Sequence, residues 1–168
     1  RRQFILSQIV SLSIKEELDQ WINDVSIKWP NDIYWKDKKI CGILIENDLS
    51  SHFIERSISG IGININQEEF YSNAPNPISL KQITGQEYNR RIILDGIMQR
   101  IQKYYTLLQT DETTTSTLIS TNYGLHLFRR EGLHHYEDCN GQFRAFLERV
   151  KPDGRLILKD EAGYIREY

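Results

Sequence analysis

Three short apolar runs rich in β-branched residues stand out in the first third of the chain. They cover residues 25–27, 40–45 and 58–65, and each is bounded by Gly, Asn, Asp or Pro. Runs of this length and composition predict strands. The polar residues 36–38 indicate the tip or far arm of a hairpin between the first two runs. Residues 47–52 predict a polar hairpin loop before the third.

Residues 4–22 repeat apolar side chains at helical spacing, while their charged residues fall on other faces. This pattern predicts an amphipathic helix that packs on the sheet. The side chains expected near its packed face are Ile5, Ile9, Leu12, Leu18, Trp21 and Ile22, and those expected away from it are Lys15, Glu16, Glu17 and Asp19.

Further helices are expected between the strands and residue 131. Residues 78–85 predict a short helix that begins at a serine cap and ends at a glycine. Residues 89–108 predict a long helix, residues 111–116 a polar Thr-rich linker, and residues 117–130 another helix. The packed stripe expected for the long helix comprises Leu94, Ile97, Met98, Ile101, Tyr104, Tyr105 and Leu108.

The pattern changes near Gly132, where short strands alternate with turns. Residues 142–150 and 155–159 predict two strands separated by the turn Lys151-Pro152-Asp153-Gly154. A further turn at residues 160–163 precedes the apolar end of the chain. Short strands joined by such turns predict a small antiparallel β-unit.

Composition narrows the class of protein. The 168 residues are 39% hydrophobic, which is enough for one packed domain with a small appendix. The 21 basic and 23 acidic side chains nearly cancel, which argues against a nucleic-acid binder driven by bulk charge. Cys41 and Cys139 show neither a disulfide framework nor metal-ligand spacing, and no apolar run is long enough to span a membrane. A reducing, cytoplasmic compartment is expected, with no membrane and no nucleic acid as partner.

Three motifs follow one another in the stretch 28–66. They are Lys28-Trp29-Pro30-Asn31-Asp32, then Lys39-Ile40-Cys41-Gly42-Ile43-Leu44-Ile45-Glu46, then Gly60-Ile61-Gly62-Ile63-Asn64. The last is not a dinucleotide fingerprint, because it lacks a third glycine and a following helix. In this order and at this spacing, the three motifs resemble the catalytic centre of biotin protein ligases, which attach biotin to carboxylase subunits.

A weaker resemblance extends over nearly the whole chain and implies the fold. It implies an α/β (α+β) protein with a mixed β-sheet flanked by helices, followed by a small C-terminal β-barrel-like unit. Residues 1–131 would be the C-terminal part of the ligase catalytic domain and residues 132–168 the small β domain. The family's Gly-Arg-Gly-Arg-rich loop, which closes over biotin and the adenylate, is absent from residues 1–27. An N-terminally truncated chain, inactive by itself unless another chain supplies that loop, is therefore expected.

The activity that the resemblance implies is ATP-dependent biotinylation. The biotin carboxylate attacks the α-phosphorus of ATP, pyrophosphate leaves, and biotinyl-5′-AMP forms. A lysine amine of a biotin carboxyl carrier protein domain then attacks the mixed anhydride, and AMP leaves. ATP and Mg²⁺ are the implied cofactors and biotin is the substrate. An exposed sheet edge is a common dimer surface in such enzymes, so a homodimer is also considered.

Both steps move negative charge between carboxylate and phosphate oxygens, so they need a positioned cation. Lys39 matches the family's catalytic lysine, and its compact ammonium would bridge the biotin carboxylate and the α-phosphate. The alternative is that Lys36, Lys38 and Lys39 only form a solvated hairpin. That alternative is preferred for Lys36 and Lys38.

The first motif is expected to serve the nucleotide. Lys28 would contact nucleotide phosphate, and Trp29 would form a wall of the nucleotide site. Asn31 and Asp32 would orient the nucleotide and its magnesium, with Asp32 as a hard oxygen ligand or acting through water. The alternative for Asn31 and Asp32 is a plain turn.

The glycines and the asparagine of the other motifs complete the predicted site. Gly42 and Gly62 would let a ligand approach the backbone closely. Asn64 matches the family's asparagine near adenosine, and its amide would pair with the adenine edge or the ribose. Its alternative role is that of a residue ending a strand in a turn.

Two other classes of function compete with the biotin ligase. A lipoate ligase or octanoyl transferase is similar in fold but lacks the Lys-Trp-Pro-Asn-Asp string. A non-catalytic module, such as a biotin sensor or a carrier-docking domain, would bind biotin or carrier without releasing AMP.

Overall fold

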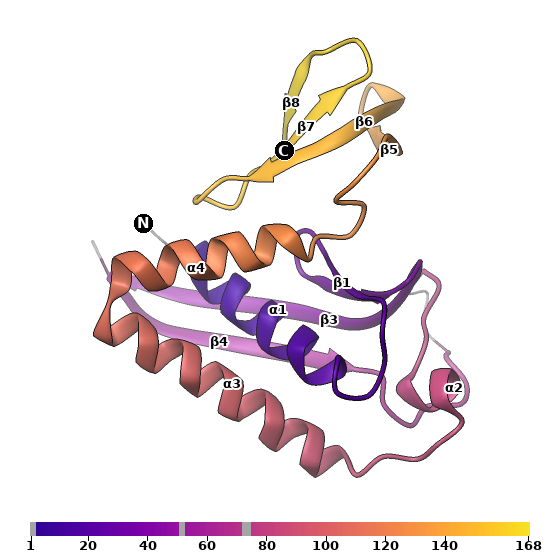
Figure 1. Ribbon diagram of the computed structural model, residues 1–168, viewed down its shortest axis with the longest axis vertical. Helices are drawn as coiled ribbons and strands as arrows, with labels where there is room; N and C mark the ends of the chain where they lie inside the picture. The colour runs from indigo at the N-terminus through magenta and orange to yellow at the C-terminus, as the bar shows by residue number, and fades with distance from the viewer. Residues whose placement is uncertain (1–2, 51–52, 72–74) are drawn as a thin grey trace.

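The computed structural model describes residues 3–50, 53–71 and 75–168. Two four-stranded sheets and four helices make up these parts of the chain, and the second sheet forms one end of an elongated molecule (Figure 1). The first sheet has the order β1-β2-β3-β4, with β1 Val25–Lys28, β2 Asp32–Trp35, β3 Lys38–Ser50 and β4 Phe53–Ile63. The second has the order β5-β6-β7-β8, with β5 His134–Asp138, β6 Gly141–Val150, β7 Leu156–Asp160 and β8 Ile165–Glu167.

Neighbouring strands in both sheets are antiparallel, so each sheet is a meander of consecutive strands. Parallel pairing occurs at two isolated bridges, Ile27 with Leu127 and Lys39 with Pro77. The α/β fold class with a helix-flanked sheet and a C-terminal β-unit is confirmed, but the sheet expected to be mixed has antiparallel strand pairs throughout its described part. Within the described ranges, no helix has the length and apolar character to cross a membrane.

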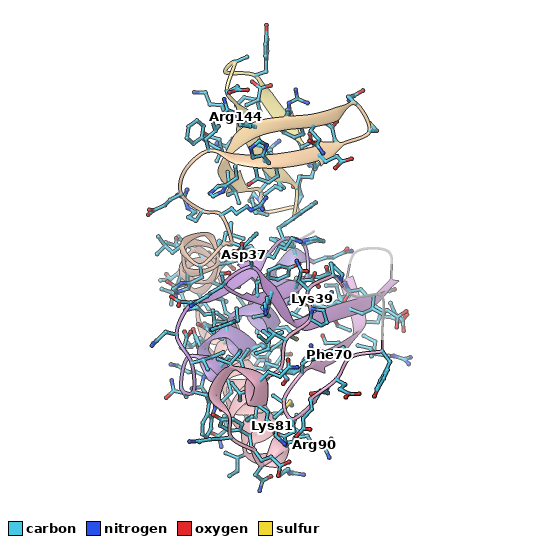
Figure 2. All side chains as sticks on the ribbon, turned by 90° about the vertical axis from the view of Figure 1, so that its right-hand side faces the viewer. Asp37, Lys39, Phe70, Lys81, Arg90 and Arg144 are labelled. Atoms are coloured by element: carbon cyan, nitrogen blue, oxygen red, sulfur yellow. The ribbon has the colours of Figure 1, made fainter. Side chains whose placement is uncertain are left out.

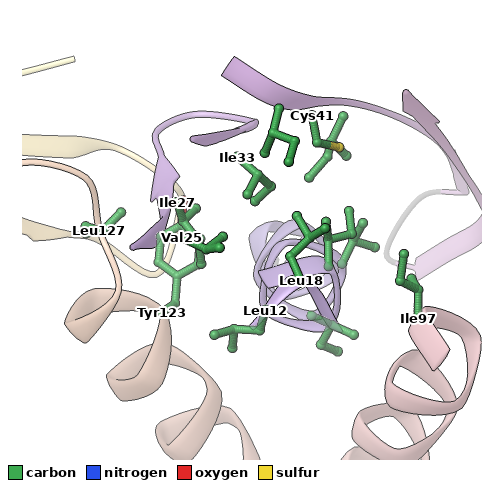
Figure 3. Close-up of a cluster of buried hydrophobic side chains, with 14 of the residues drawn as sticks. Leu12, Leu18, Val25, Ile27, Ile33, Cys41, Ile97, Tyr123 and Leu127 are labelled. Carbon is green, nitrogen blue, oxygen red and sulfur yellow. The ribbon is translucent and has the colours of Figure 1, made fainter. Parts of the chain in front are cut away.

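The helices are α1 Phe4–Leu18, α2 Leu80–Thr84, α3 Arg90–Thr110 and α4 Glu112–Leu125. The first of them lies against β1 and β2 and is flanked by α3 and α4 (Figure 1). The core forms around it, where Leu12 and Leu18 meet Ile33 and Cys41 from the sheet (Figure 3).

Burial around α1 is the first departure from the sequence-based expectation. Lys15 and Glu17, which were expected on exposed faces, are both buried. Each is paired there, Lys15 with Asp19 at 2.5 Å and Glu17 with Arg100 of α3 at 2.5 Å. Because α1 is covered on several sides, these two side chains are not solvated by water. Each is paired with an oppositely charged side chain instead.

The hairpin loop expected at residues 47–52 is replaced by strand. The pairs Asn47–Ser57 and Asp48–Arg56 continue the β3–β4 ladder, and β3 reaches Ser50, while residues 51–52 lie outside the described ranges. Asp48 and Arg56 of this end are exposed and form an ion pair at 3.3 Å. Polarity there reflects exposure and not a turn.

The helical half of the chain is largely as expected, with two corrections. The linker predicted at 111–116 is the start of α4, because Asp111 accepts the N–H of Thr114 at 3.0 Å and caps the helix. In α3, Ile93, Ile97 and Tyr104 are buried. The expected stripe is therefore rotated, and its members Leu94, Met98 and Tyr105 are exposed. Helix α2 carries the predicted serine cap, as a complete capping box, and the predicted glycine end.

The second sheet contains the two predicted strands as β6 and β7, together with β5 and β8. It is attached to the rest of the molecule near the end of β1. The indole N–H of Trp29 donates to the carbonyl of Gly154 at 2.8 Å, and a guanidinium N–H of Arg130 donates to the carbonyl of Leu147 at 3.4 Å. Phe4 of α1 also lies against Gly154.

Candidate active site

Four residues of the predicted site form one row across the first sheet. In the strand register, Lys28 is paired with Asp32, Asp32 with Gly42, and Gly42 with Gly62. Directly opposite residues of antiparallel strands point to the same face of the sheet. The register therefore brings the first, second and third motifs together on one face.

That face is the one that the helices leave uncovered within the described structure. Along β3, Ile43 is buried toward the helices, whereas Leu44 is 62% exposed on the opposite side. Its neighbours on β4 are Gly60, which is opposite Leu44, and Ile58, which is 54% exposed. The result is an open, partly apolar sheet surface whose centre consists of glycine backbone.

An ion pair occupies the middle of the row. The Lys39 Nζ atom lies 2.6 Å from Oδ1 of Asp32, and the two side chains keep 26% and 20% of their surface exposed. Gly42 makes this placement possible. A Cβ at that position would lie 3.3 Å from Cε and Nζ of Lys39 and 3.6 Å from the Asp32 carboxylate. The glycine predicted to admit a ligand thus also makes room for the lysine.

The backbone of Lys39 is held from a distant part of the chain. Its N–H donates to the carbonyl of Asn76 at 2.9 Å, and its carbonyl accepts the N–H of Ile78 at 2.9 Å. Asn64 follows β4 nearby, and its N–H donates to the carbonyl of Ile40 at 2.9 Å. Lys39 and Asn64 are therefore neighbours, at the start of the strand that Figure 2 shows with Lys39 labelled.

The Asn31 side chain fastens the first motif to β3. Its amide nitrogen donates to the carbonyl of Ile43 at 2.7 Å, and the N–H of Ile43 donates back to the carbonyl of Asn31 at 2.9 Å. This reciprocal pair fixes the turn before Asp32 beside the strand of Lys39. The side-chain amide N–H thus has a structural use, as in the plain-turn alternative, while the Asn31 side chain remains exposed.

Lys28 and Trp29 lie toward the second sheet and not toward the ion pair. The Lys28 ammonium donates to the Tyr34 hydroxyl at 2.9 Å and lies 4.5 Å from the centre of its ring. Trp29 is hydrogen-bonded to the carbonyl of Gly154, and Lys28 and Trp29 line a cavity whose wall does not include Lys39. The structure therefore splits the five-residue motif between two places.

Known proteins resemble this chain in sequence and in fold. The model of the biotin/lipoate A/B protein ligase family matches residues 3–64. The bifunctional ligase/repressor BirA of Bacillus spizizenii is 29% identical over 147 residues, 84% of this chain and 44% of the relative. That of Salmonella typhimurium is 30% identical over 157 residues, 93% of this chain and 42% of the relative.

A solved structure agrees over the full length of the chain. The biotin protein ligase from Aquifex aeolicus, in complex with biotin and ATP, is similar to this chain with a TM-score of 0.77 and 26% identity. The match covers 100% of this chain and 69% of the Aquifex chain. The chain belongs to the biotin protein ligase family. It spans less than half the length of the curated relatives it matches.

Cys41 lies beneath the ion pair of this biotin ligase family member. Burial, the largest cause, and the charge of Asp32 raise the pKa of its thiol to about 12, although the charge of Lys39 acts in the opposite direction. A thiol in such a setting stays protonated at neutral pH and is a weak nucleophile. Cys41 is therefore a buried residue of β3 that contributes to packing and not a nucleophile of the site.

The fit of a magnesium ion depends on Asp32 alone. The described residues contain no group of three or more His, Cys, Asp or Glu side chains that would hold a metal. Oδ1 of Asp32 is paired with Lys39, and Oδ2 has no hydrogen-bond partner among the described residues. Magnesium in nucleotide sites is commonly bound by one or two carboxylates together with phosphate oxygens and water. Asp32 fits such a site as a single protein ligand.

Sequence reasoning missed three residues that contribute to the site. Asn76 and Ile78, which hold the Lys39 backbone, stand in and after the irregular stretch 67–77, where residues 72–74 lie outside the described ranges. Tyr34, whose hydroxyl accepts a hydrogen bond from the Lys28 ammonium, was not singled out by the sequence pattern. The only available signal was Pro77, since proline limits how that stretch enters the next helix.

Proposed function

We propose that this chain forms part of a biotin–protein ligase that activates biotin with ATP and transfers it to a lysine of a biotin carboxyl carrier protein. The proposal rests on membership of the family and on one observation. A lysine ammonium is held by a carboxylate, above a glycine, on an open sheet face. The Aquifex relative was solved with biotin and ATP, which is consistent with the same pair of ligands here.

Lys39 is the proposed catalytic residue. Its ammonium has three N–H donors, and one is directed at Asp32. The other two can reach a biotin carboxylate and an α-phosphate together. As a carboxylate oxygen forms its bond to phosphorus and the bond to pyrophosphate breaks, negative charge shifts between the groups that this cation contacts. Asp32 keeps the ammonium in position before the anions arrive.

The remaining site residues are assigned to the nucleotide and to biotin by their positions in the row or beside it. Asn64, beside Lys39, is proposed to bind the adenosine. Gly42 and Gly62 would let the ligand lie close to the sheet. Asn31 is proposed to orient the nucleotide from its turn.

Lys28 and Trp29 remain proposed nucleotide contacts, although they line the neighbouring cavity. Lys28 is one strand away from Asp32 in the row, and it would have to turn from Tyr34 to reach a phosphate. Magnesium, bound through Asp32, would neutralise phosphate charge. In the transfer step, the acceptor amine attacks the acyl carbon, and the bond to the AMP oxygen breaks.

The proposal extends to domains, partners and location. We assign residues 1–131 to the catalytic domain and residues 132–168 to a small β domain, since the second sheet begins at His134. The acceptor is proposed to be a carrier domain of a biotin-dependent carboxylase, and a homodimer is a further hypothesis. The cytoplasm, with no nucleic acid bound by this chain, remains the expected setting.

The decisive experiment replaces Lys39 within the longest polypeptide that the gene encodes. In that protein, Lys39→Ala should abolish biotin-dependent exchange of labelled pyrophosphate into ATP while the circular dichroism spectrum stays unchanged. Lys38→Ala is the matched control, because Lys38 is exposed at the neighbouring position, and it should keep the exchange. Full exchange by the Lys39→Ala protein would remove the assignment.

The same assay separates the rival functions. Exchange that depends on lipoate or octanoate, with no response to biotin, would identify a lipoate-type ligase. Calorimetric binding of biotin without exchange in the wild-type protein would identify a sensor or docking module. Exchange by this chain alone would contradict the expectation that another segment must supply the Gly-Arg-rich loop.

A further inference from the structure

A cavity of about 390 Å³ lies between the two sheets, on the side where β1 ends. Lys28 and Trp29 of the first sheet line it together with aromatic residues of the second sheet. Sites for small organic ligands usually have volumes from about 300 Å³ upward, so this cavity admits one compact molecule. Lys39, Asp32 and Gly42 do not line it, so Lys28 and Trp29 are the residues that it shares with the candidate active site.

The walls of the cavity are flat and apolar. Phe143 lies between Tyr136 and Tyr168, with ring centroids 6.0 and 6.4 Å away and ring planes inclined by only 22° and 13°. The Trp29 indole adds a further ring, fixed by its bond to the carbonyl of Gly154. Nearly parallel aromatic faces favour a planar ring over a branched aliphatic group.

Two cations line this apolar space without a carboxylate partner among the described residues. The Lys28 ammonium is held by the hydroxyl and ring of Tyr34. The Arg129 guanidinium donates to the carbonyl of His135 at 2.7 Å and lies 5.9 Å from the ring of Tyr136. Neutral partners orient both charges but do not cancel them, so the cavity favours an anion.

Two further features of the cavity, the position of Glu137 and the backbone of Arg129, also favour an anionic ligand. The one acidic residue of the lining, Glu137, is exposed and directed at Gln142 at 3.5 Å, which leaves the two cations in excess. Arg129 also has a left-handed backbone with φ of 57°, which is uncommon for a residue with a side chain. Backbone strain of this kind often occurs where a side chain must be placed for a ligand.

We propose that this cavity binds a small planar aromatic acid. Its ring would lie along Phe143 and Trp29, and its carboxylate would accept hydrogen bonds from Lys28 and Arg129. Since the lining comes from both sheets, the bound acid would connect the second sheet to the end of β1. The proposal does not depend on the ligase activity, because Lys39, Asp32 and Gly42 do not line the cavity, although Lys28 and Trp29 are also proposed nucleotide contacts.

The test uses 1-naphthoate as the probe and the chain as it stands. Isothermal titration calorimetry should show saturable one-to-one binding, and the amide resonances of Trp29 and Phe143 should shift with the same dissociation constant. Two control ligands separate the two features of the site. 1-Naphthalenemethanol keeps the rings without the charge, and cyclohexanecarboxylate keeps the charge without the aromatic ring. Each should bind at least tenfold more weakly.

Variants locate the binding. Lys28→Met and Arg129→Gln should each raise the dissociation constant of 1-naphthoate about tenfold, the usual effect of removing a hydrogen bond to a charged group. Lys159→Met and Arg149→Gln are matched controls at exposed positions away from the lining, and they should leave it unchanged. Arg129→Gly is a second variant that suits the left-handed backbone if the glutamine destabilises the chain.

Three results would overturn the proposal. The first is a wild-type chain that shows no saturable binding. The second is equal affinity for 1-naphthoate and its neutral alcohol. The third is an unchanged dissociation constant in folded Lys28→Met and Arg129→Gly proteins.

Discussion

The ammonium of Lys39 lies 2.6 Å from the carboxylate of Asp32, in the space left by the missing side chain of Gly42. The lysine comes from the second motif and the aspartate from the first, and antiparallel pairing of β2 with β3 brings them together. A cation on a sheet face would otherwise be mobile in water. Here it is directed by a neighbour before any ligand binds.

The first prediction concerns Gly42. Gly42→Ala should displace the Lys39 ammonium, because the new Cβ would lie 3.3 Å from its Cε and Nζ. We expect at least a tenfold loss of biotin-dependent pyrophosphate exchange in the full-length polypeptide. The change in unfolding free energy should be within about 1 kcal/mol, since the lysine is flexible. Gly60→Ala, whose Cβ would meet atoms only at 3.7 Å and beyond, is the control. Equal activity of both variants would contradict the proposed role of the gap.

The second prediction concerns Gly96, where α3 approaches α1. A Cβ there would lie 2.5 Å from Cδ of the buried Glu17, which is paired with Arg100. Gly96→Ala should therefore lower the unfolding free energy by about 1–3 kcal/mol in urea titrations, as overpacking does. Gly124→Ala in α4 is the matched control with open space around it, and it should raise stability by up to about 1 kcal/mol. Stabilisation by both variants would show that α1 and α3 are less tightly packed.

The third prediction concerns Cys41. Because burial raises the pKa of its thiol to about 12, iodoacetamide at pH 8 should leave it unmodified in the folded chain. The exposed Cys139 should be alkylated within the same time. Peptide mass spectrometry would quantify both, and the addition of 6 M urea should make the two rates similar. Rapid alkylation of Cys41 without denaturant would show that the sheet opens locally.

The fourth prediction concerns acid and the second sheet. Asp160 is desolvated by burial, but hydrogen bonds from the Tyr164 and Ala162 N–H groups and the charge of Arg166 outweigh this and hold its pKa below the usual value. A lowered folded-state pKa contributes stability above the unfolded value near 3.8, and that stability is lost as pH falls through the folded pKa. The urea concentration at which the second sheet is half unfolded should therefore decrease when the pH is lowered below about 4.

The variant Asp160→Asn tests that assignment. It keeps an acceptor for the two N–H groups but has no charge to titrate, so its midpoint should change less between pH 5 and pH 3 than that of the wild type. Hydrogen exchange of residues 156–167 would follow the second sheet specifically. An identical pH dependence of the two proteins would assign the acid sensitivity to other carboxylates, such as Asp138, whose pKa is also lowered, mainly by the Tyr168 hydroxyl.

The fifth prediction concerns the link between the sheets. Trp29→Phe removes the N–H that donates to the Gly154 carbonyl at 2.8 Å while it keeps an aromatic ring. The loss should be about 1 kcal/mol, and amide hydrogen exchange in residues 141–160 should accelerate. Trp35→Phe, at a partly buried tryptophan of the same sheet, is the control and should not change exchange in that range. Unaltered exchange in Trp29→Phe would show that other contacts hold the second sheet.

Local sequence signals predicted those elements that are determined by interactions between residues close together in the chain. The capping box and glycine end of α2 are satisfied within seven residues, so the pattern alone was sufficient. The beginning of α4 was missed because a Thr-rich stretch with low helix propensity is stabilised by the Asp111 cap and by its contact with α1. Tertiary packing outweighed propensity there.

The site was predictable as a set of residues but not as a geometry. The motifs named Lys39, Asp32 and Gly42, yet the proximity of these three residues depends on turn length and on a register shift between Ile33 and Tyr34. Contacts across long sequence separations, such as Trp29 with Gly154, leave no trace in a local pattern. The assignment of Lys28 and Trp29 to the nucleotide remains a prediction, since both residues lie toward the second sheet.

The two hydrogen bonds that tie the Lys39 peptide to Asn76 and Ile78 have a consequence for how the ligase would work. Because its main chain is anchored, the Lys39 ammonium can move only as far as the four methylene groups of its side chain allow. The Lys39 ammonium would then reach its ligands by changes of side-chain rotamer, which occur within nanoseconds. No movement of a hinge or lid would be needed to place it. A relative with the same motifs but a shorter connection after β4 would lose these two hydrogen bonds, and its lysine would be positioned less accurately.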